Sequence, residues 1–232
     1  MKLLIGVPTG EYSRRADFYD YLSALEKPSD CFLMSPHGQS PAKNRNIIIE
    51  AALTNNCTHV FFLDDDMVFP SDILTRLLKH SHLDVVSALY LMRNYPHYPV
   101  LFDEAYDSGL CKFMFLTPNK TGLVKAVNCG FGCVLIKTDV FKKLEKPWVT
   151  LGEIEKDGWC DDVSFFNRVR KAGFEIYCDL DVQVGHMLNL TLWPGKKEGG
   201  WNTLYKTVTG ETIEFPQFTS SAHDALVEKT GE

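Results

Sequence analysis

The segment THVFFLDDD at residues 58–66 constrains the fold of this chain more than any other part of the sequence. A short, continuous apolar run such as VFFL is typical of a buried strand. The three aspartates that follow it directly repel one another, which is destabilising unless a cation neutralises them. The segment therefore predicts a buried strand with a cation-binding site at its carboxyl end. The alternative is a solvated loop that caps the next helix.

Strands and helices alternate along the first half of the chain. Three apolar runs are expected to be strands: residues 3–7, 58–63 and 84–91. Residues 44–53 are expected to form a helix, because their apolar side chains follow the i, i+4 spacing: Ile47, Ile48, Ala51 and Ala52. Ser71 is expected to cap a further helix. This alternation predicts an α/β fold, a Rossmann-like three-layer α/β/α sandwich on a mostly parallel central sheet.

The second half of the chain is less regular. Residues 93–127 are rich in Pro, Tyr, Phe and Asn, which indicates irregular hairpins or loops beside the sheet. A strand is expected over 133–136, and Thr138 is expected to cap a short helix. Residues 162–172 predict a longer helix with three inner side chains, Phe165, Phe166 and Val169, and a stop at Gly173. The runs FEIYC and VQVGH are expected to be the closing strands.

Composition and missing motifs exclude several classes of function. Lys and Arg number 24 against 30 Asp and Glu, and this net charge of −6 argues against non-specific phosphate binding as the main role of the surface. Seven cysteines without a CxxC pair indicate neither a disulfide framework nor a zinc ribbon. The sequence contains no GxGxxG after a strand, no GxxxxGK[ST] and no GxSxG.

The hydropathy of the sequence predicts a soluble, cytoplasmic protein. The first apolar run stops at Pro8, which is too early for a secretory signal peptide. No stretch approaches the roughly 18 apolar residues that a membrane span requires, so no membrane span is expected.

Three of the expected strands end in residues suited to binding. They end in Pro8-Thr9-Gly10, in Asp64-Asp65-Asp66 and in Gly185-His186. Ligands of parallel α/β sheets bind at the carboxyl ends of the strands, so these residues are expected to line one crevice. Alternation along a strand places Asp64 and Asp66 on the same side, with Asp65 opposed. Carboxylates together with an imidazole favour Mn²⁺ or Mg²⁺ over a metal that prefers soft ligands.

Three segments, in order, resemble the GT-A glycosyltransferases, and among them the family-2-like enzymes that use nucleotide sugars. The run NRNIIIEAALTNNCTHVFFLDDDMVFP resembles their nucleotide-sugar-binding half, where a helix with an Arg-Asn pair precedes a strand ending in the DxD motif. The run GWCDDVSFFNRVRKAGFEIYCDLDVQVGH resembles their acceptor-side segment, where an acidic pair opens a helix and a later strand delivers a His. Between them, NCGFGCVLIKTDVFKKL resembles their glycine-containing strand and short helix.

The resemblance assigns roles to the strand-end residues. It implies that Asp66 and His186 coordinate the metal, and that Asp64 lies on the metal or on the donor ribose. Further substrate-binding residues would be Pro8, Thr9, Arg45, Asp65 and Gly130, the first three close to the nucleotide base. The alternatives are a structural histidine at 186 and an ordinary solvated helix residue at 45.

The resemblance also places the acidic pair Asp161 and Asp162 at the catalytic centre. A helix N-terminus favours the ionised carboxylate that a base requires, and Asp162 is the candidate base. The alternative is that one aspartate is an N-cap and the other a helix-start charge. The two interpretations are compatible if Asp161 or Cys160 lies near the cap and Asp162 faces the crevice.

The implied catalytic domain covers residues 1–186, with residues 187–232 as a flexible flap and C-terminal extension of the same domain. The glycines of LNLTLWPGKKEGGW permit a hinge. Lys196 and Lys197 are expected to meet a diphosphate, and Trp193 or Trp201 to close over the sugar. The alternative for this segment is an exposed polar turn.

The sequence therefore predicts a metal-dependent enzyme that moves a sugar from a nucleoside diphosphate sugar, UDP-linked by preference, to an acceptor hydroxyl. Its cofactor would be Mn²⁺ or Mg²⁺, with inversion slightly favoured and retention left open. The alternatives are a nucleotidyltransferase on a related fold and a non-catalytic sugar- or nucleotide-binding module. The acceptor is a glycan, a small molecule, a protein or a modified DNA base, and a homodimer is one way to complete its recognition.

Overall fold

The computed structural model describes residues 1–10, 16–93, 97–106, 111–117, 119–150, 160–188, 190–197, 200–207 and 212–213, with side chains up to Leu188. The chain divides into two compact units, Met1–Met187 and Leu188–Glu232.

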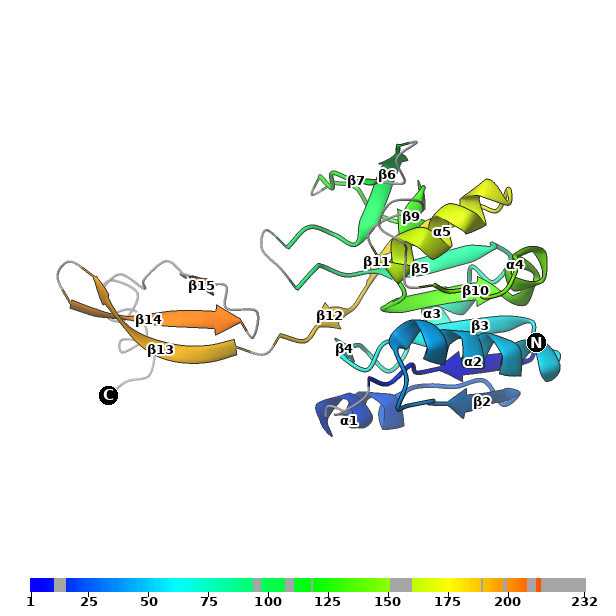
Figure 1. Ribbon diagram of the computed structural model, residues 1–232, viewed down its shortest axis with the longest axis horizontal. Coiled ribbons are helices and arrows are strands. Elements are labelled where there is room, and N and C mark those ends of the chain that lie inside the picture. The colour runs from blue at the N-terminus through cyan, green and yellow to red at the C-terminus, as the bar shows by residue number, and fades with distance from the viewer. Residues whose placement is uncertain are drawn as a thin grey trace. The chain divides into compact units, whose positions relative to one another are not determined.

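The first unit is built on a seven-stranded sheet with the order β2-β1-β3-β10-β5-β11-β8 (Figure 1). Its strands are β1 (Leu3–Gly6), β2 (Cys31–Met34), β3 (His59–Leu63), β5 (Val85–Leu89), β8 (Leu123–Ala126), β10 (Cys133–Lys137) and β11 (Ile176–Gln183). β2, β1, β3, β5 and β11 share one direction, and β10 and β8 run against it. The mostly parallel central sheet predicted from the sequence is confirmed.

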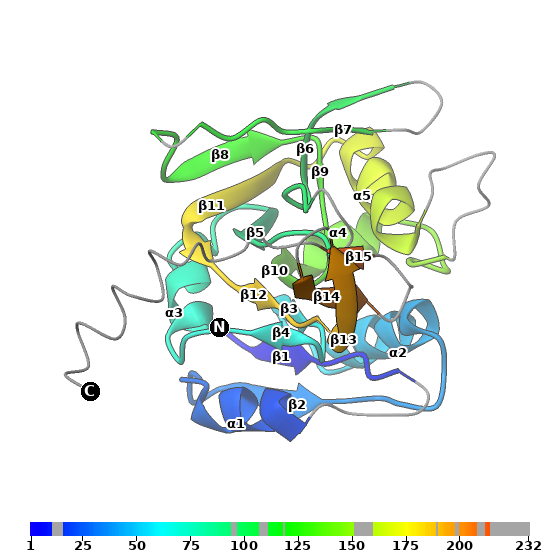
Figure 2. The ribbon, with the colours of Figure 1, turned by 90° about the vertical axis from the view of Figure 1, so that its left-hand side faces the viewer.

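Helices cover both faces of this sheet. One face carries α2 (Pro41–Thr54), α4 (Thr138–Lys143) and α5 (Asp161–Lys171), and the other carries α1 (Ala16–Ala24) and α3 (Ile73–Leu78). In Figure 2, α2 and α5 lie to the right of the sheet and α3 to its left. Phe61 and Phe62 of β3 are fully buried in opposite core clusters, because successive side chains of a strand point to opposite faces. The predicted three-layer sandwich is confirmed.

Helix α2 confirms the helix predicted over 44–53 but faces the core with a different set of residues. It starts earlier, where the Ser40 hydroxyl accepts a hydrogen bond from the Lys43 N–H and Pro41 takes the first position. Ile47, one of the apolar positions whose spacing indicated the helix, is 41% exposed. Four of its buried residues follow the i, i+3, i+4, i+7 pattern of one helical face: Arg45, Ile48, Ile49 and Ala52.

Two predicted N-caps are wrong and one predicted stop is confirmed. Asp72, not Ser71, is the N-cap of α3, and Lys137 precedes α4. Thr138 is the first residue of α4, and its hydroxyl donates to the carbonyl of Cys57 at 2.7 Å, which ties the helix to the chain just before β3. Gly173 ends α5 with φ of +90°, a conformation that favours glycine.

Smaller strands complete the first unit. The segment predicted to form irregular hairpins contains β6 (Leu101–Ala105) and β7 (Cys111–Phe113), which join β9 (Asn128–Cys129) in a separate sheet. β4 (Met67–Val68) pairs antiparallel with β12 (Gly185–His186). This short pairing joins the chain after the three aspartates to the chain that carries His186.

The second unit contains a three-stranded antiparallel sheet in the order β13-β14-β15. The strands are β13 (Leu190–Lys197), β14 (Gly200–Thr207) and β15 (Thr212–Ile213). Trp193, Lys196 and Lys197 all lie on β13, and their side chains are outside the described part of the structure. The flap role of residues 187–232 stays a prediction.

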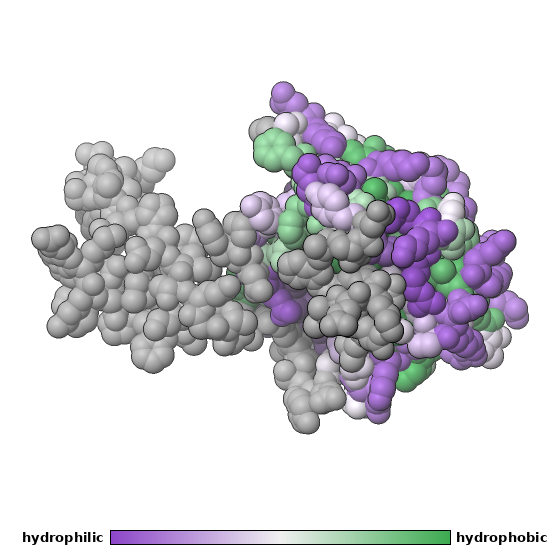
Figure 3. Space-filling model, turned by 45° about the horizontal axis from the view of Figure 1, so that its top comes forward, coloured by the Kyte–Doolittle hydropathy of each residue, from purple (hydrophilic) through white to green (hydrophobic). Residues whose placement is uncertain are grey.

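The face of the first unit that Figure 3 shows is predominantly hydrophilic, with small apolar areas. Among the helices within the described ranges, none has both the length and the apolar character that a membrane span requires.

Candidate functional site

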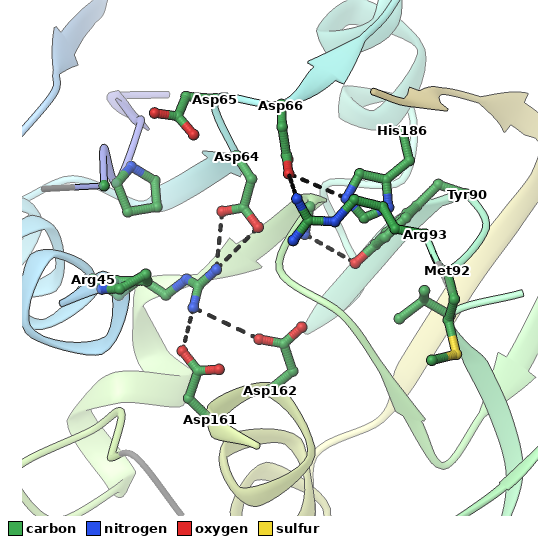
Figure 4. A pocket seen from close by; sticks show the side chains of 15 residues that line it. Arg45, Asp64, Asp65, Asp66, Tyr90, Met92, Arg93, Asp161, Asp162 and His186 are labelled. Atoms are coloured by element: carbon green, nitrogen blue, oxygen red, sulfur yellow. Dashed lines mark hydrogen bonds and ion pairs between the residues drawn. The ribbon is translucent and has the colours of Figure 1, made fainter. Parts of the chain in front are cut away.

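A cavity of about 530 Å³ opens at the carboxyl ends of the central strands (Figure 4). Its walls come from the chain after β1, β3 and β5, from α2, from the glycine segment before β10, from the start of α5 and from β12. The ionisable residues that line it are Arg45, Asp64, Asp65, Asp66, Tyr90, Arg93, Asp161, Asp162 and His186. The expectation that the strand ends of 8–10, 64–66 and 185–186 meet in one crevice therefore agrees with the structure.

A buried guanidinium group organises one side of this cavity. Arg45 Nη2 lies 2.9 and 3.0 Å from the two carboxylate oxygens of Asp64. Its Nη1 donates to Asp161 and lies 3.6 Å from Asp162 Oδ1. Arg45 is only 4% exposed, so it is not an ordinary solvated helix residue. Burial disfavours the charged guanidinium, but the attraction of the three carboxylates outweighs this and raises its pKa further.

Local packing fixes Arg45 in that position. Its guanidinium lies 4.4 Å above the ring of Phe131, a cation–π contact. On either side of it in α2, Asn44 Nδ2 donates to the carbonyl of Thr9 at 2.8 Å and Asn46 Nδ2 to that of Val149 at 2.6 Å. The sequence NRN therefore ties the first turns of α2 to the end of β1 and to the chain after α4, and places the arginine between them.

Asp162 lies at the start of α5 and faces the cavity. Cys160 is the N-cap of that helix, so both aspartates are within its first turn. Asp162 Oδ2 accepts a hydrogen bond from the Phe131 N–H at 3.3 Å. Burial raises the pKa of Asp162 to about 7, with Arg45 opposing the rise and the charge of Asp161 adding to it. A carboxyl group with this pKa accepts and releases a proton near neutral pH.

Two glycines before β10, Gly130 and Gly132, allow other residues of the site to approach the backbone closely. A Cβ atom at Gly130 would lie 2.0 Å from Tyr90 Oη and 3.0 Å from Asp162 Oδ2. Gly132 lines the cavity, and its N–H donates to Tyr90 Oη at 3.1 Å. Because Gly130 has no side chain, Tyr90 and Asp162 can both lie close to its backbone.

His186 and Asp66 form a second cluster, on the opposite side of the cavity from Arg45 (Figure 4). His186 Nδ1 lies 2.8 Å from the carbonyl of Leu91, so this nitrogen carries the hydrogen. His186 Nε2 faces the cavity and lies 3.3 Å from Asp66 Oδ2. The β4–β12 pairing and a 2.8 Å bond from the Met187 N–H to the Asp66 carbonyl fix the two residues relative to each other.

The balance of charge in the cavity determines what it can bind. Of the described residues that line it, five are aspartates and two are arginines. Burial and the charges of Asp66 and Asp64 raise the pKa of Asp65 to about 6, and its buried Oδ2 has no hydrogen-bond partner among the described residues. Such an excess of carboxylates repels a diphosphate unless a further cation enters.

The residues present fit a divalent cation. In the described ranges, no group of three or more His, Cys, Asp or Glu side chains is already arranged to hold a metal ion. Asp66 Oδ2 and His186 Nε2 supply one carboxylate oxygen and one imidazole nitrogen, and a hydrogen bond from the second ring nitrogen to a carbonyl is typical of metal-binding histidines. Asp64 is less suited, because both of its oxygens bind Arg45.

The two predicted residues after β1 differ in position. Pro8 lines the cavity, and its contact with the donor stays a prediction. Thr9 is buried instead, and its hydroxyl lies 2.9 Å from that of Ser35.

The lining residues that were not predicted from the sequence include Tyr90, Met92 and Arg93. All three follow β5. The rule that directs attention to strand ends therefore applies to them as well, but no short motif marks them.

Comparisons with known proteins bear on the fold. No protein-family model matches the sequence, and no curated protein matches it. Among solved structures, the chain is similar to A197 from STIV, with a TM-score of 0.58 and 18% identity over 94% of this chain and 96% of that one. It is also similar to GalNAc-T7 with UDP, GalNAc and Mn²⁺, with a TM-score of 0.50 and 13% identity over 80% of this chain and 43% of that one.

A further match is apo UDP-glucose pyrophosphorylase, with a TM-score of 0.42 and 11% identity over 80% of this chain and 74% of that one. At these identities, the likeness to A197 and to GalNAc-T7 shows the fold alone. The predicted GT-A-type α/β sandwich is confirmed in this sense.

Replacing Arg45 with methionine is expected to lower the free energy of unfolding at pH 7 by about 3–5 kcal/mol, because three carboxylates would lose their shared cation. Urea unfolding measures this change. Arg45→Lys keeps the charge but loses the fork of donors, so an intermediate loss is expected. Lys43→Met, an exposed change on the same helix, should alter stability by less than about 0.5 kcal/mol. An Arg45→Met protein as stable as the wild type would contradict the role of this cluster.

Proposed function

We propose that this chain is a metal-dependent glycosyltransferase that moves a sugar from a nucleoside diphosphate sugar, UDP-linked by preference, to an acceptor hydroxyl. One observation carries the proposal. At the carboxyl ends of the central strands, a carboxyl group with a pKa near 7 shares a cavity with an Asp–His pair suited to a divalent cation. A base and a cation site in one cavity suit inverting glycosyl transfer from such a donor.

In this proposal, Asp66 and His186 would hold a divalent cation, Mn²⁺ or Mg²⁺, which would supply positive charge to the leaving diphosphate. Pro8 forms the wall beside the end of β1, where the base of the nucleotide would lie. Asp64, fixed by Arg45, presents acceptor oxygens to the donor ribose. The cavity volume of about 530 Å³ is within the range of pockets that bury small ligands.

Asp162 is the proposed base. It would take the proton of the acceptor hydroxyl as that oxygen attacks the anomeric carbon, which gives inversion of configuration. Arg45 stays charged throughout and limits the rise in the pKa of Asp162 that burial causes. Asp161, bonded to Arg45, is a positioning residue that keeps the guanidinium facing Asp162.

Incubation of the protein with a panel of UDP-sugars and Mn²⁺ tests the proposal. We expect one sugar nucleotide to be consumed with release of UDP, faster when an acceptor is supplied. Release of pyrophosphate would contradict the proposal and favour a nucleotidyltransferase. Binding of a sugar nucleotide without turnover, in the presence of glycan, protein and nucleic-acid acceptors, would favour a binding module. Asp66→Asn should abolish the release of UDP and serves as the negative control.

Asp162→Asn is expected to lower kcat by about 100-fold or more while the affinity for the sugar nucleotide is retained. In the wild type, the raised pKa means that the base form is lost as the pH falls through about 7, so kcat/KM should fall toward tenfold per pH unit below that value. The groups that face Asp162 and influence this pKa are Arg45, Asp161, Asp64 and the Phe131 N–H.

Asp139→Asn provides the matched control, because Asp139 occupies the first turn of another helix and its side chain is 72% exposed. An Asp162→Asn enzyme with unchanged kcat, or a wild-type profile without the loss near pH 7, would rule out Asp162 as the base.

A further inference from the structure

Arg93 is the second guanidinium group of the cavity, and it binds the oxygen that faces His186. Its Nη1 lies 3.1 Å from Asp66 Oδ2, and His186 Nε2 lies 3.3 Å from the same oxygen. Figure 4 shows the Arg93 guanidinium beside Asp66 and His186. The guanidinium therefore lies where a cation shared by these two residues would lie.

The two arginines of the cavity differ in how firmly they are held. The side chain of Arg45 is 5% exposed and is fixed by three carboxylates and the ring of Phe131. The side chain of Arg93 is 52% exposed, and its described ion pair is with Asp66 alone. An ion pair of a half-exposed side chain contributes little to stability, so Arg93 can leave Asp66 at small cost.

Arg93 and a divalent cation compete for Asp66. Both are positive, and a metal ion coordinated by Asp66 Oδ2 and His186 Nε2 would lie within a few ångströms of the guanidinium in its present position. Like charges at that separation repel each other, so binding of the metal displaces Arg93.

Hydrogen bonds hold the backbone just before Arg93. Leu91, two residues earlier, holds His186 Nδ1 through its carbonyl, and the Met92 N–H donates to the Tyr98 carbonyl at 2.9 Å. The side chain can therefore swing while its Cα remains beside the cation position. A planar guanidinium with several N–H donors suits the oxygens of a diphosphate.

We propose that Arg93 is an exchangeable cation of this site: it holds Asp66 while no metal is bound, leaves when a divalent cation binds Asp66 and His186, and then binds the diphosphate of the donor. This inference deepens the proposed function and, in its last step, rests on it. Competition for Asp66 concerns the chain's own residues and the metal alone.

Binding of Mn²⁺ without any nucleotide tests the first step, with free Mn²⁺ measured by its electron paramagnetic resonance signal. We expect Arg93→Gln to bind Mn²⁺ about fivefold tighter than the wild type, because both the ion pair and the repulsion are removed. Arg93→Lys should fall between the two. Arg170→Gln makes the same change of charge at an exposed position in the last turn of α5 and should leave the affinity unchanged. Unchanged or weaker Mn²⁺ binding by Arg93→Gln would overturn the proposal.

Binding of UDP in saturating Mn²⁺ tests the last step by calorimetry. We expect Arg93→Gln to weaken UDP binding about fivefold and Arg170→Gln to leave it unchanged. Equal affinity of Arg93→Gln and wild type for UDP would overturn the role of Arg93 toward the diphosphate. Because the Mn²⁺ measurement uses no nucleotide, it tests the exchange of Arg93 with the metal separately from the proposed sugar transfer. A protein that transfers no sugar but gains Mn²⁺ affinity on loss of Arg93 would contradict the proposed function and support the exchange.

Discussion

The site depends on one buried charge. Arg45 joins three carboxylates from distant parts of the sequence: Asp64 at the end of β3, and Asp161 and Asp162 at the start of α5. Without a cation between them, these acids would repel one another at a position where burial already disfavours their charge. The arginine therefore lets the sheet end and the helix start approach, and this approach leaves Asp162 with a pKa near 7.

On the other side of the cavity, the cation is held less firmly. Asp66 and His186 are brought together by the short β4–β12 pairing, and the counter-ion there is a half-exposed arginine that is not packed into the core. The cavity thus combines a permanent cation with a position where cations exchange. A fixed arginine beside the base and an exchangeable cation on the other side suit a reaction in which the base stays in place while a charged diphosphate binds and is released.

The sequence predicted the main strands and helices of the fold, and it predicted that several acidic residues line one cavity, because both follow from local patterns. Apolar runs marked the strands β1, β3 and β5, and the acidic residues after β3 and at α5 marked the cavity. The rest depends on tertiary packing. The apolar run at 133–136 predicts a strand, but it does not show that β10 runs antiparallel to its neighbours. The apolar spacing in α2 predicts a helix, but it does not decide which side faces the core, and Ile47 is exposed. Arg93 and Tyr90 carry no motif, so only their place after β5 could have indicated them.

The position of a bound metal tests the account most directly. Crystals of the protein grown with Mn²⁺ and UDP would show the metal by its anomalous scattering. The account predicts a peak bonded to Asp66 and His186 Nε2, with the Arg93 guanidinium away from Asp66. UDP bound in the cavity without a metal, or a metal held by other residues, would contradict it.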